Sequence, residues 1–133
     1  ATSPYYASWV DDAPRVYQEI RRAVLERDLE RLGDAMEQSA LMMHASMLAV
    51  RPAVVYFQPT TFAVMSEVRA LRSRGIPAYY TMDAGPHVKV LTRPEHASAV
   101  AEALGRVPGV EGTRLSGPGP DATLTDSEFR GRA

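Results

Sequence analysis

The sequence has 133 residues, of which 45% are hydrophobic, and it contains no cysteine. This length suffices for one compact domain but not for two ordinary ones, and the lack of cysteine excludes disulfides, thiolate metal sites and a cysteine nucleophile. Fifteen basic and sixteen acidic residues are interspersed, so no nucleic-acid-binding patch is indicated. No apolar run is long enough to cross a bilayer, and no secretory signal pattern is present. We therefore expect a cytoplasmic protein.

The first two predicted elements are helices. Asp12 and Pro14 are typical of a helix start, because the aspartate can cap the helix and the first turn does not need the N–H that proline lacks. This helix is expected to continue to about Arg27. Asp28 can then cap a second helix, which ends before Pro52 and whose second half is apolar on most sides.

Residues 53–57, AVVYF, suit a short strand or an extended link. A third helix is expected to open at Thr60 or Thr61 and to end at Gly75, where glycine can adopt a left-handed conformation. Apolar residues then alternate on both sides of Gly85 in the segment IPAYYTMDAGPHVKVLT, residues 76–92. This pattern predicts a β-hairpin.

The rest of the chain predicts one more helix and one more strand. Thr92 and Glu95 form a Ser/Thr-x-x-Glu capping pattern ahead of a helix that Gly105 would end. VEGTRL, residues 110–115, is expected to be a strand, and residues 117–133 a loose tail. This order of elements predicts an α+β fold, a two-layer sandwich of helices on a mainly antiparallel sheet.

Asp83 is the first candidate for chemistry. A carboxylate at the end of a strand, next to Ala84 and Gly85, allows another molecule to approach closely and could act as a general base or orient a hydroxyl. The alternative is a turn aspartate that bonds its own backbone, and aspartates of this kind outnumber catalytic ones.

The three histidines are weaker candidates. His44, on the most apolar helix, could be a ligand or a proton carrier, although a neutral core histidine bonded to a backbone carbonyl is more common. The same alternatives hold for His87, and His96 is expected to be solvated. Because no carboxylates accompany them at ligand spacing, the sequence predicts no metal site, and it shows no nucleotide-binding loop.

Three segments together resemble a known family: TSPYYASWV, ERDLERLGDAMEQSALMMHASMLAVRP and VVYFQPTTFAVMSEVRALRSRGIPAYYTMDAGPHVKVL. In order and spacing they are similar to the C-terminal half of diphosphomevalonate decarboxylases, members of the GHMP kinase superfamily. The resemblance covers residues from about 2 to 105. Its most specific part is YYTMDAGPHVKVL, which follows the family's Thr-Met-Asp-Ala-Gly-Pro-Asn-Val pattern except that His87 replaces asparagine.

The resemblance implies that residues 1–133 form a ferredoxin-like C-terminal domain whose N-terminal ATP-binding domain is absent. In the family, mevalonate diphosphate is phosphorylated by Mg-ATP on its tertiary hydroxyl and then loses phosphate and carbon dioxide to give isopentenyl diphosphate, a step of isoprenoid biosynthesis. Asp83 matches the catalytic carboxylate, Ala84 lies against the substrate and Gly85 keeps the turn tight. ATP and Mg²⁺ are expected to bind mainly to the absent domain, and the intact protein is expected to be a homodimer.

Two alternatives stay open. The chain could be half of a phosphomevalonate decarboxylase or of a mevalonate kinase, since the groups that distinguish one phosphate from two lie in the absent half. It could also be a non-catalytic α+β module for ligand binding or dimerisation, in which Asp83 is only a turn residue. On the decarboxylase hypothesis the chain is an excised domain, a proteolytic fragment or one chain of a split enzyme, and it is inactive alone.

Overall fold

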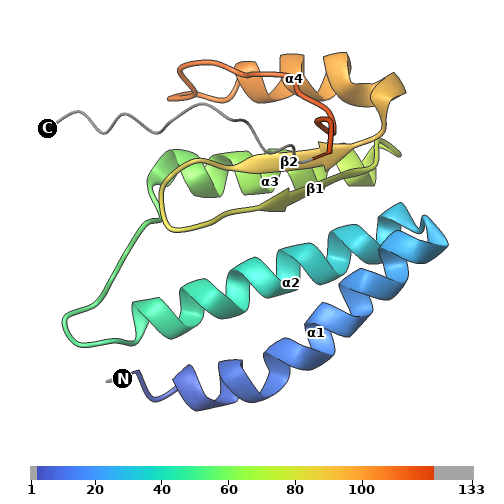
Figure 1. Cartoon of the computed structure of the whole chain (residues 1–133). Helices are drawn as coiled ribbons and strands as arrows, with labels where there is room; N and C mark the ends of the chain where they lie inside the picture. The colour runs from blue at the N-terminus through green and yellow to red at the C-terminus, as the bar shows by residue number, and fades with distance from the viewer. Residues whose placement is uncertain (1–2, 122–133) are drawn as a thin grey trace, which may run out of the picture.

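The computed structural model describes residues 3–121, which form four α-helices, a short 3-10 helix and a two-stranded antiparallel sheet (Figure 1). The elements along the chain are α1 (Tyr6–Glu26), α2 (Leu29–Leu48), α3 (Pro59–Ser73), β1 (Ala78–Thr81), β2 (Lys89–Thr92), η1 (Pro94–His96) and α4 (Ala97–Gly105). The α+β class predicted from the sequence is confirmed. None of the helices within residues 3–121 combines the length and the hydropathy needed to span a membrane.

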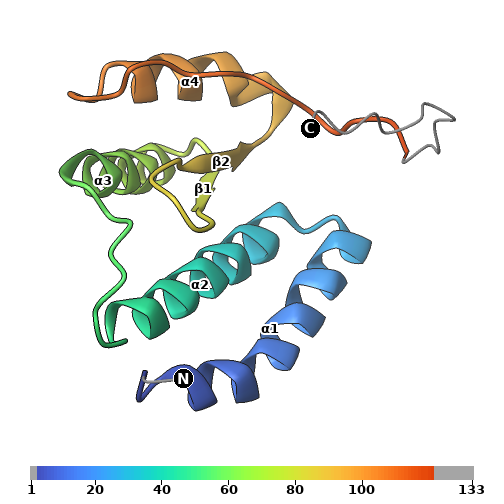
Figure 2. The same cartoon turned by 60° about the vertical axis from the view of Figure 1, so that its left-hand side comes forward.

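Helix α1 begins earlier than predicted. It starts at Tyr6, so that Pro14 lies in its interior, and Asp12 caps nothing but binds Arg15 through two hydrogen bonds of 2.6 and 2.8 Å. Pro14 cannot donate the bond that would reach the carbonyl of Val10, and Figures 1 and 2 show the first turns of α1 inclined to the rest. The prediction was wrong because apolar residues continue at helical spacing before the proline and outweigh its effect.

The start of α2 agrees with the sequence. The Asp28 carboxylate accepts a hydrogen bond from the backbone N–H of Arg31 at 3.0 Å, as a capping aspartate should. After α2 the chain runs to α3 as an extended link, and residues 53–57 make no strand pairing. Of the two alternatives for this segment, the link is therefore confirmed.

Helix α3 begins at Pro59, one residue before Thr60, the earlier of the two predicted starts. The hydroxyl oxygen of Thr61 accepts a hydrogen bond from the backbone N–H of Gln58 at 3.1 Å, and the proline occupies the position where no donor is needed. At the other end Gly75 has φ of +83°, the left-handed conformation expected there.

The predicted hairpin is confirmed, but two other expectations are not. β1 and β2 pair antiparallel, with Tyr80 opposite Val90. Thr92 does not cap the next helix, since its hydroxyl donates instead to the carbonyl of Pro77 at 2.6 Å, and a 3-10 turn precedes α4. Residues 110–115 form no strand and are largely exposed, and they pair with neither β1 nor β2. Of the expected tail, residues 117–121 have no regular structure, and residues 122–133 lie outside the described part.

The core lies between the hairpin and the helices α3 and α4 (Figure 2). Ala78 and Tyr80 of β1 point into this core, since alternate residues of a strand share a face. Its other buried members come from the two helices: Val64, Met65, Val68, Leu71, Val100 and Leu104. Helix α2 packs on β1 from another side, and α1 packs on α2.

The edge of β1 that faces α2 is closed by an ion pair. Glu37 of α2 and Arg72 of α3 form two hydrogen bonds, of which Nη2 to Oε2 measures 3.0 Å. Oε1 of Glu37 also accepts from the backbone N–H of Tyr80 at 3.1 Å, and Nη1 of Arg72 donates to the carbonyl of Ala78 at 2.6 Å. Charged side chains thus satisfy backbone groups that a third strand would otherwise pair.

Candidate functional site

Asp83 lies at the start of the turn 82–88, which joins β1 to β2. Met82 is 2% exposed and anchors this end of the turn in the protein interior. Asp83 follows the end of β1 at Thr81, and its side chain is 79% exposed. The carboxylate can therefore be reached by another molecule.

Lys89 is the partner of this carboxylate. Its Nζ donates to Oδ2 of Asp83 across the mouth of the hairpin, where Lys89 stands opposite Thr81. Both side chains are exposed, at 59% for Lys89, so the pair is hydrated and contributes at most about 1 kcal/mol. Sequence reasoning missed this contact, although Lys89 is the only lysine of the chain and the hairpin register would have placed it near the turn.

Ala84 and Gly85 follow Asp83 in the same turn. Ala84 is exposed, so only a methyl group separates the backbone from an approaching molecule. Gly85 has φ of +148°, a conformation that other residues rarely adopt, while a Cβ there would meet no atom within 4 Å. Glycine is thus required by the backbone conformation and not by lack of space. The three residues singled out from the sequence are consecutive in this turn, where Asp83 and Ala84 are exposed and Gly85 is partly buried.

His44 is the buried neighbour of this turn. Its side chain is 2% exposed, and its Nε2 is buried without a hydrogen-bond partner among residues 3–121. Burial lowers the pKa of His44 below its ordinary value, and the negative charge of Asp83 opposes this by raising it. The expected bond from a core histidine to a backbone carbonyl is therefore not found at Nε2. His87, in the turn, is exposed.

Aromatic contacts extend from His44 to the surface. The His44 ring lies 4.7 Å from that of Phe57 and 6.2 Å from that of Tyr56, and Phe57 lies 5.0 Å from Phe62. Phe62, in the first turn of α3, is exposed, as are Leu48 at the end of α2 and Val54 and Val55 in the link between the two helices. We call these four residues the apolar patch. The link 49–58 and the turn 82–88 lie at the same end of the molecule in both views (Figures 1 and 2).

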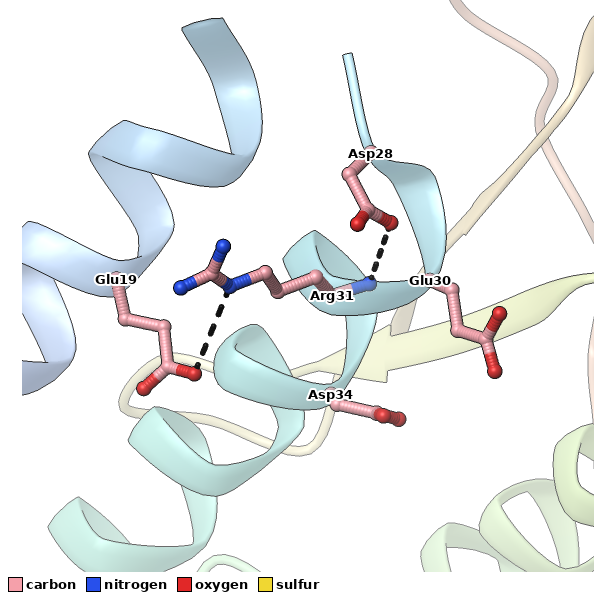
Figure 3. A pocket seen from close by; sticks show the side chains of 5 residues that line it. All are labelled: Glu19, Asp28, Glu30, Arg31 and Asp34. Atoms are coloured by element: carbon pink, nitrogen blue, oxygen red, sulfur yellow. Dashed lines mark hydrogen bonds and ion pairs between the residues drawn. The ribbon is translucent and has the colours of Figure 1, made fainter. Parts of the chain in front are cut away.

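A separate polar depression lies between α1 and α2 (Figure 3). It has a volume of about 310 Å³ and is lined by Glu19, Asp28, Glu30, Arg31 and Asp34. Arg31 is engaged with Glu19 at 3.9 Å, and Asp28 caps α2, so part of its lining already has structural roles. A neighbouring depression of about 390 Å³ shares Glu19 and Arg31. Neither contains Asp83, which stands on open surface.

The described residues contain no cluster of potential metal ligands. Within residues 3–121 no three or more His, Cys, Asp or Glu side chains are grouped so that they could hold one. His44, His87 and His96 are not brought together as a cluster.

Comparison with known proteins assigns the chain to a family. The family model of the mevalonate 5-diphosphate decarboxylase C-terminal domain matches residues 1–115. A curated relative, phosphomevalonate decarboxylase from Haloferax volcanii, is 32% identical over 83% of this chain and 34% of its own length.

Solved structures agree in fold and sequence. Mevalonate diphosphate decarboxylase from Staphylococcus aureus is 35% identical with a TM-score of 0.75, over 77% of this chain and 31% of that one. A structure described as MDDEF in complex with MVAPP, AMPPCP and magnesium is 36% identical with a TM-score of 0.75, over 78% of this chain and 32% of that one. The chain spans about a third of the length of these relatives. It belongs to the mevalonate 5-diphosphate decarboxylase C-terminal domain family.

Proposed function

We propose that this chain is the C-terminal part of an ATP-dependent decarboxylase that converts mevalonate 5-diphosphate and ATP into isopentenyl diphosphate, ADP, phosphate and carbon dioxide. The observation that carries the proposal is the exposed carboxylate of Asp83, followed by Ala84 and Gly85, in a chain of this family. The names of the relatives support the reaction, and the complex with MVAPP, AMPPCP and magnesium supports the substrates.

In the proposed reaction Asp83 accepts a hydrogen bond from the 3-hydroxyl of the substrate. It orients this oxygen toward the γ-phosphorus of ATP and takes its proton as the new P–O bond forms and ADP leaves. The C3–O bond then breaks and releases phosphate. Electrons of the bond to the substrate carboxylate form the new double bond, and carbon dioxide leaves. The small side chain of Ala84 and the turn at Gly85 let the substrate approach closely.

The rest of the enzyme is proposed to cover the end of the domain that carries Asp83. The apolar patch, Leu48, Val54, Val55 and Phe62, is exposed at this end and is suited to burial against another part of the protein. ATP and Mg²⁺ are proposed to bind mainly to that other part, because the described residues form no metal site. The homodimer and the cytoplasmic location stay predictions.

Substitution of Asp83 in the complete protein tests the proposal. Asp83→Asn should lower kcat by about a thousandfold or more and change KM by only a few fold, since the interaction is made chiefly in the transition state. Release of ADP and of carbon dioxide should be measured separately, because a kinase would give the first without the second. Asp34→Asn, at another exposed aspartate, is the matched control and should leave kcat and KM unchanged. Asp83→Asn with near-normal kcat would favour the non-catalytic module.

A second candidate function is the decarboxylation of phosphomevalonate. It is favoured by the 32% identity to the Haloferax volcanii enzyme of that name. Values of kcat/KM for the monophosphate and the diphosphate, measured with the complete protein, distinguish the two substrates. The same assay excludes a mevalonate kinase if carbon dioxide is released.

A further inference from the structure

We propose that His44 is a positioning residue for Asp83. In the assembled active site its Nε2–H donates a hydrogen bond to the Asp83 carboxylate, which leaves Lys89 to receive it. One carboxylate oxygen is then held by the domain interior, and the other is free to face the substrate hydroxyl. This inference rests on the proposed function, and it adds a residue that the reaction itself does not require.

The alignment of α2 with β1 brings the two residues to the same level. Gly33 meets Tyr79, and further along both elements Glu37 bonds the backbone of Tyr80, so the helix and the strand run in the same direction. The seven residues from Glu37 to His44 advance the helix by roughly 10 Å, and the three residues from Tyr80 to Asp83 advance the strand by roughly 10 Å. Asp83 is also near enough for its negative charge to raise the pKa of His44, against the larger lowering by burial.

Packing alone does not explain an imidazole at this position. The ring of His44 contacts the aromatic rings of Tyr56 and Phe57, and a phenylalanine could make the same contacts. Its Nε2 is buried and makes no hydrogen bond with residues 3–121. Burying a polar nitrogen without a partner lowers stability, and a catalytic role is one of the causes for which native proteins keep such a group.

The present partner of Asp83 is easily exchanged. Its ion pair with Lys89 is open to water on both sides, so little free energy is lost when it breaks. When another part of the protein covers the apolar patch, water around the turn 82–88 is displaced, and a hydrogen bond from His44 becomes stronger. Since burial favours the neutral form of His44, this ring donates through a single N–H and needs no additional proton.

Two variants of His44 in the complete protein test the inference. His44→Phe keeps the size and aromatic contacts but removes Nε2, and it should lower kcat by roughly tenfold to a hundredfold with KM within about threefold. Its melting temperature should stay the same or rise, because an unpaired buried nitrogen is removed. His44→Gln places an amide N–H near the position of Nε2 and should recover at least threefold of the lost kcat.

Several outcomes would overturn the inference. These are a normal kcat for His44→Phe, a loss of kcat that follows a loss of stability, or no recovery with His44→Gln. If Asp83→Asn is inactive while His44→Phe is normal, the proposed function survives and only the role of His44 fails. If Asp83→Asn is active, the proposed function itself fails.

A measurement on the unmodified ring covers the case in which the variants do not fold. In the complete protein, mevalonate diphosphate with AMPPCP and Mg²⁺ should shift the imidazole ¹⁵N resonance of His44 Nε2. The shift should be lost in Asp83→Ala saturated with the same ligands, because this variant has no side-chain acceptor for the Nε2–H. An unchanged Nε2 resonance in the saturated wild-type protein contradicts the hydrogen bond.

Discussion

Gly33 of α2 lies directly against the ring of Tyr79 in β1, and a Cβ at residue 33 would overlap that ring. Only glycine lets the helix approach the strand this closely. The close approach is what brings Glu37 to the backbone of Tyr80 and His44 to the level of Asp83. A residue far from the chemistry thus sets the distance between the two elements that form the candidate site.

Gly33→Ala should therefore destabilise the domain. The new methyl group forces α2 and β1 apart, and overpacking of this kind costs about 1–3 kcal/mol. Gly105→Ala is the matched control, because a Cβ there meets no atom within 4 Å, and it should be neutral or slightly stabilising. Urea unfolding of both variants measures the difference, and equal free energies of unfolding would contradict the close contact.

Removal of Glu37 should be more damaging. Glu37→Leu leaves Arg72 without its carboxylate and the N–H of Tyr80 without its acceptor, and we expect a loss of roughly 2–4 kcal/mol in the free energy of unfolding. Glu67→Gln breaks an ion pair with Arg74 at the surface and should cost less than about 1 kcal/mol. The prediction fails if chemical denaturation finds the two losses similar.

Stability should fall in mild acid because of His44. The pKa of His44 is lowered in the folded state, chiefly by burial, from an ordinary value of 6.5. As the pH falls below about 6.5 the unfolded state binds the proton more readily, so folding loses up to about 1.4 kcal/mol per pH unit until the folded pKa is reached. Unfolding measured from pH 7.5 to 5 should show a shallower decline for His44→Phe than for wild type. An equally steep decline in both proteins would contradict the prediction.

Asp83→Ala should leave the fold intact. The carboxylate is exposed and its partner Lys89 is hydrated, so the free energy of unfolding should change by less than about 0.5 kcal/mol. Thermal unfolding in parallel with the activity assay checks this. If activity and stability fell together, Asp83 would have a structural role in the turn.

The 133-residue chain alone should not hydrolyse ATP or release carbon dioxide. Its described residues form no metal site, and its sequence has no loop suited to nucleotide phosphates. The chain should nevertheless fold, because its core and the closed edge of β1 are made within residues 3–121. Circular dichroism and an assay for free phosphate test both statements, and robust turnover by the purified chain would contradict the first.

Local patterns of the sequence were enough to predict the second and third helices and the hairpin. Asp28, Gly75 and the alternating residues around Gly85 act through neighbours along the chain, so their effect is visible in the sequence. The start of α1 was predicted wrongly because Asp12 and Pro14 can mark either the start of a helix or a position inside a longer one. The packing of α1 on α2 favours the longer helix. The strand expected at residues 110–115 was wrong because a strand needs a partner edge, which periodicity does not reveal.

The sequence by itself determined the family, through the residues around Asp83, and the class of fold, through the spacing of apolar residues. Only the tertiary structure decided that Lys89 pairs with Asp83, that Glu37 closes the edge of β1 and that the Nε2 of His44 is buried without a partner within residues 3–121. Glu37 and Tyr80 are 43 residues apart in the chain, and the helix and strand that carry them meet only because Gly33 leaves room for Tyr79. Contacts of this range depend on how elements pack, which local propensity does not encode.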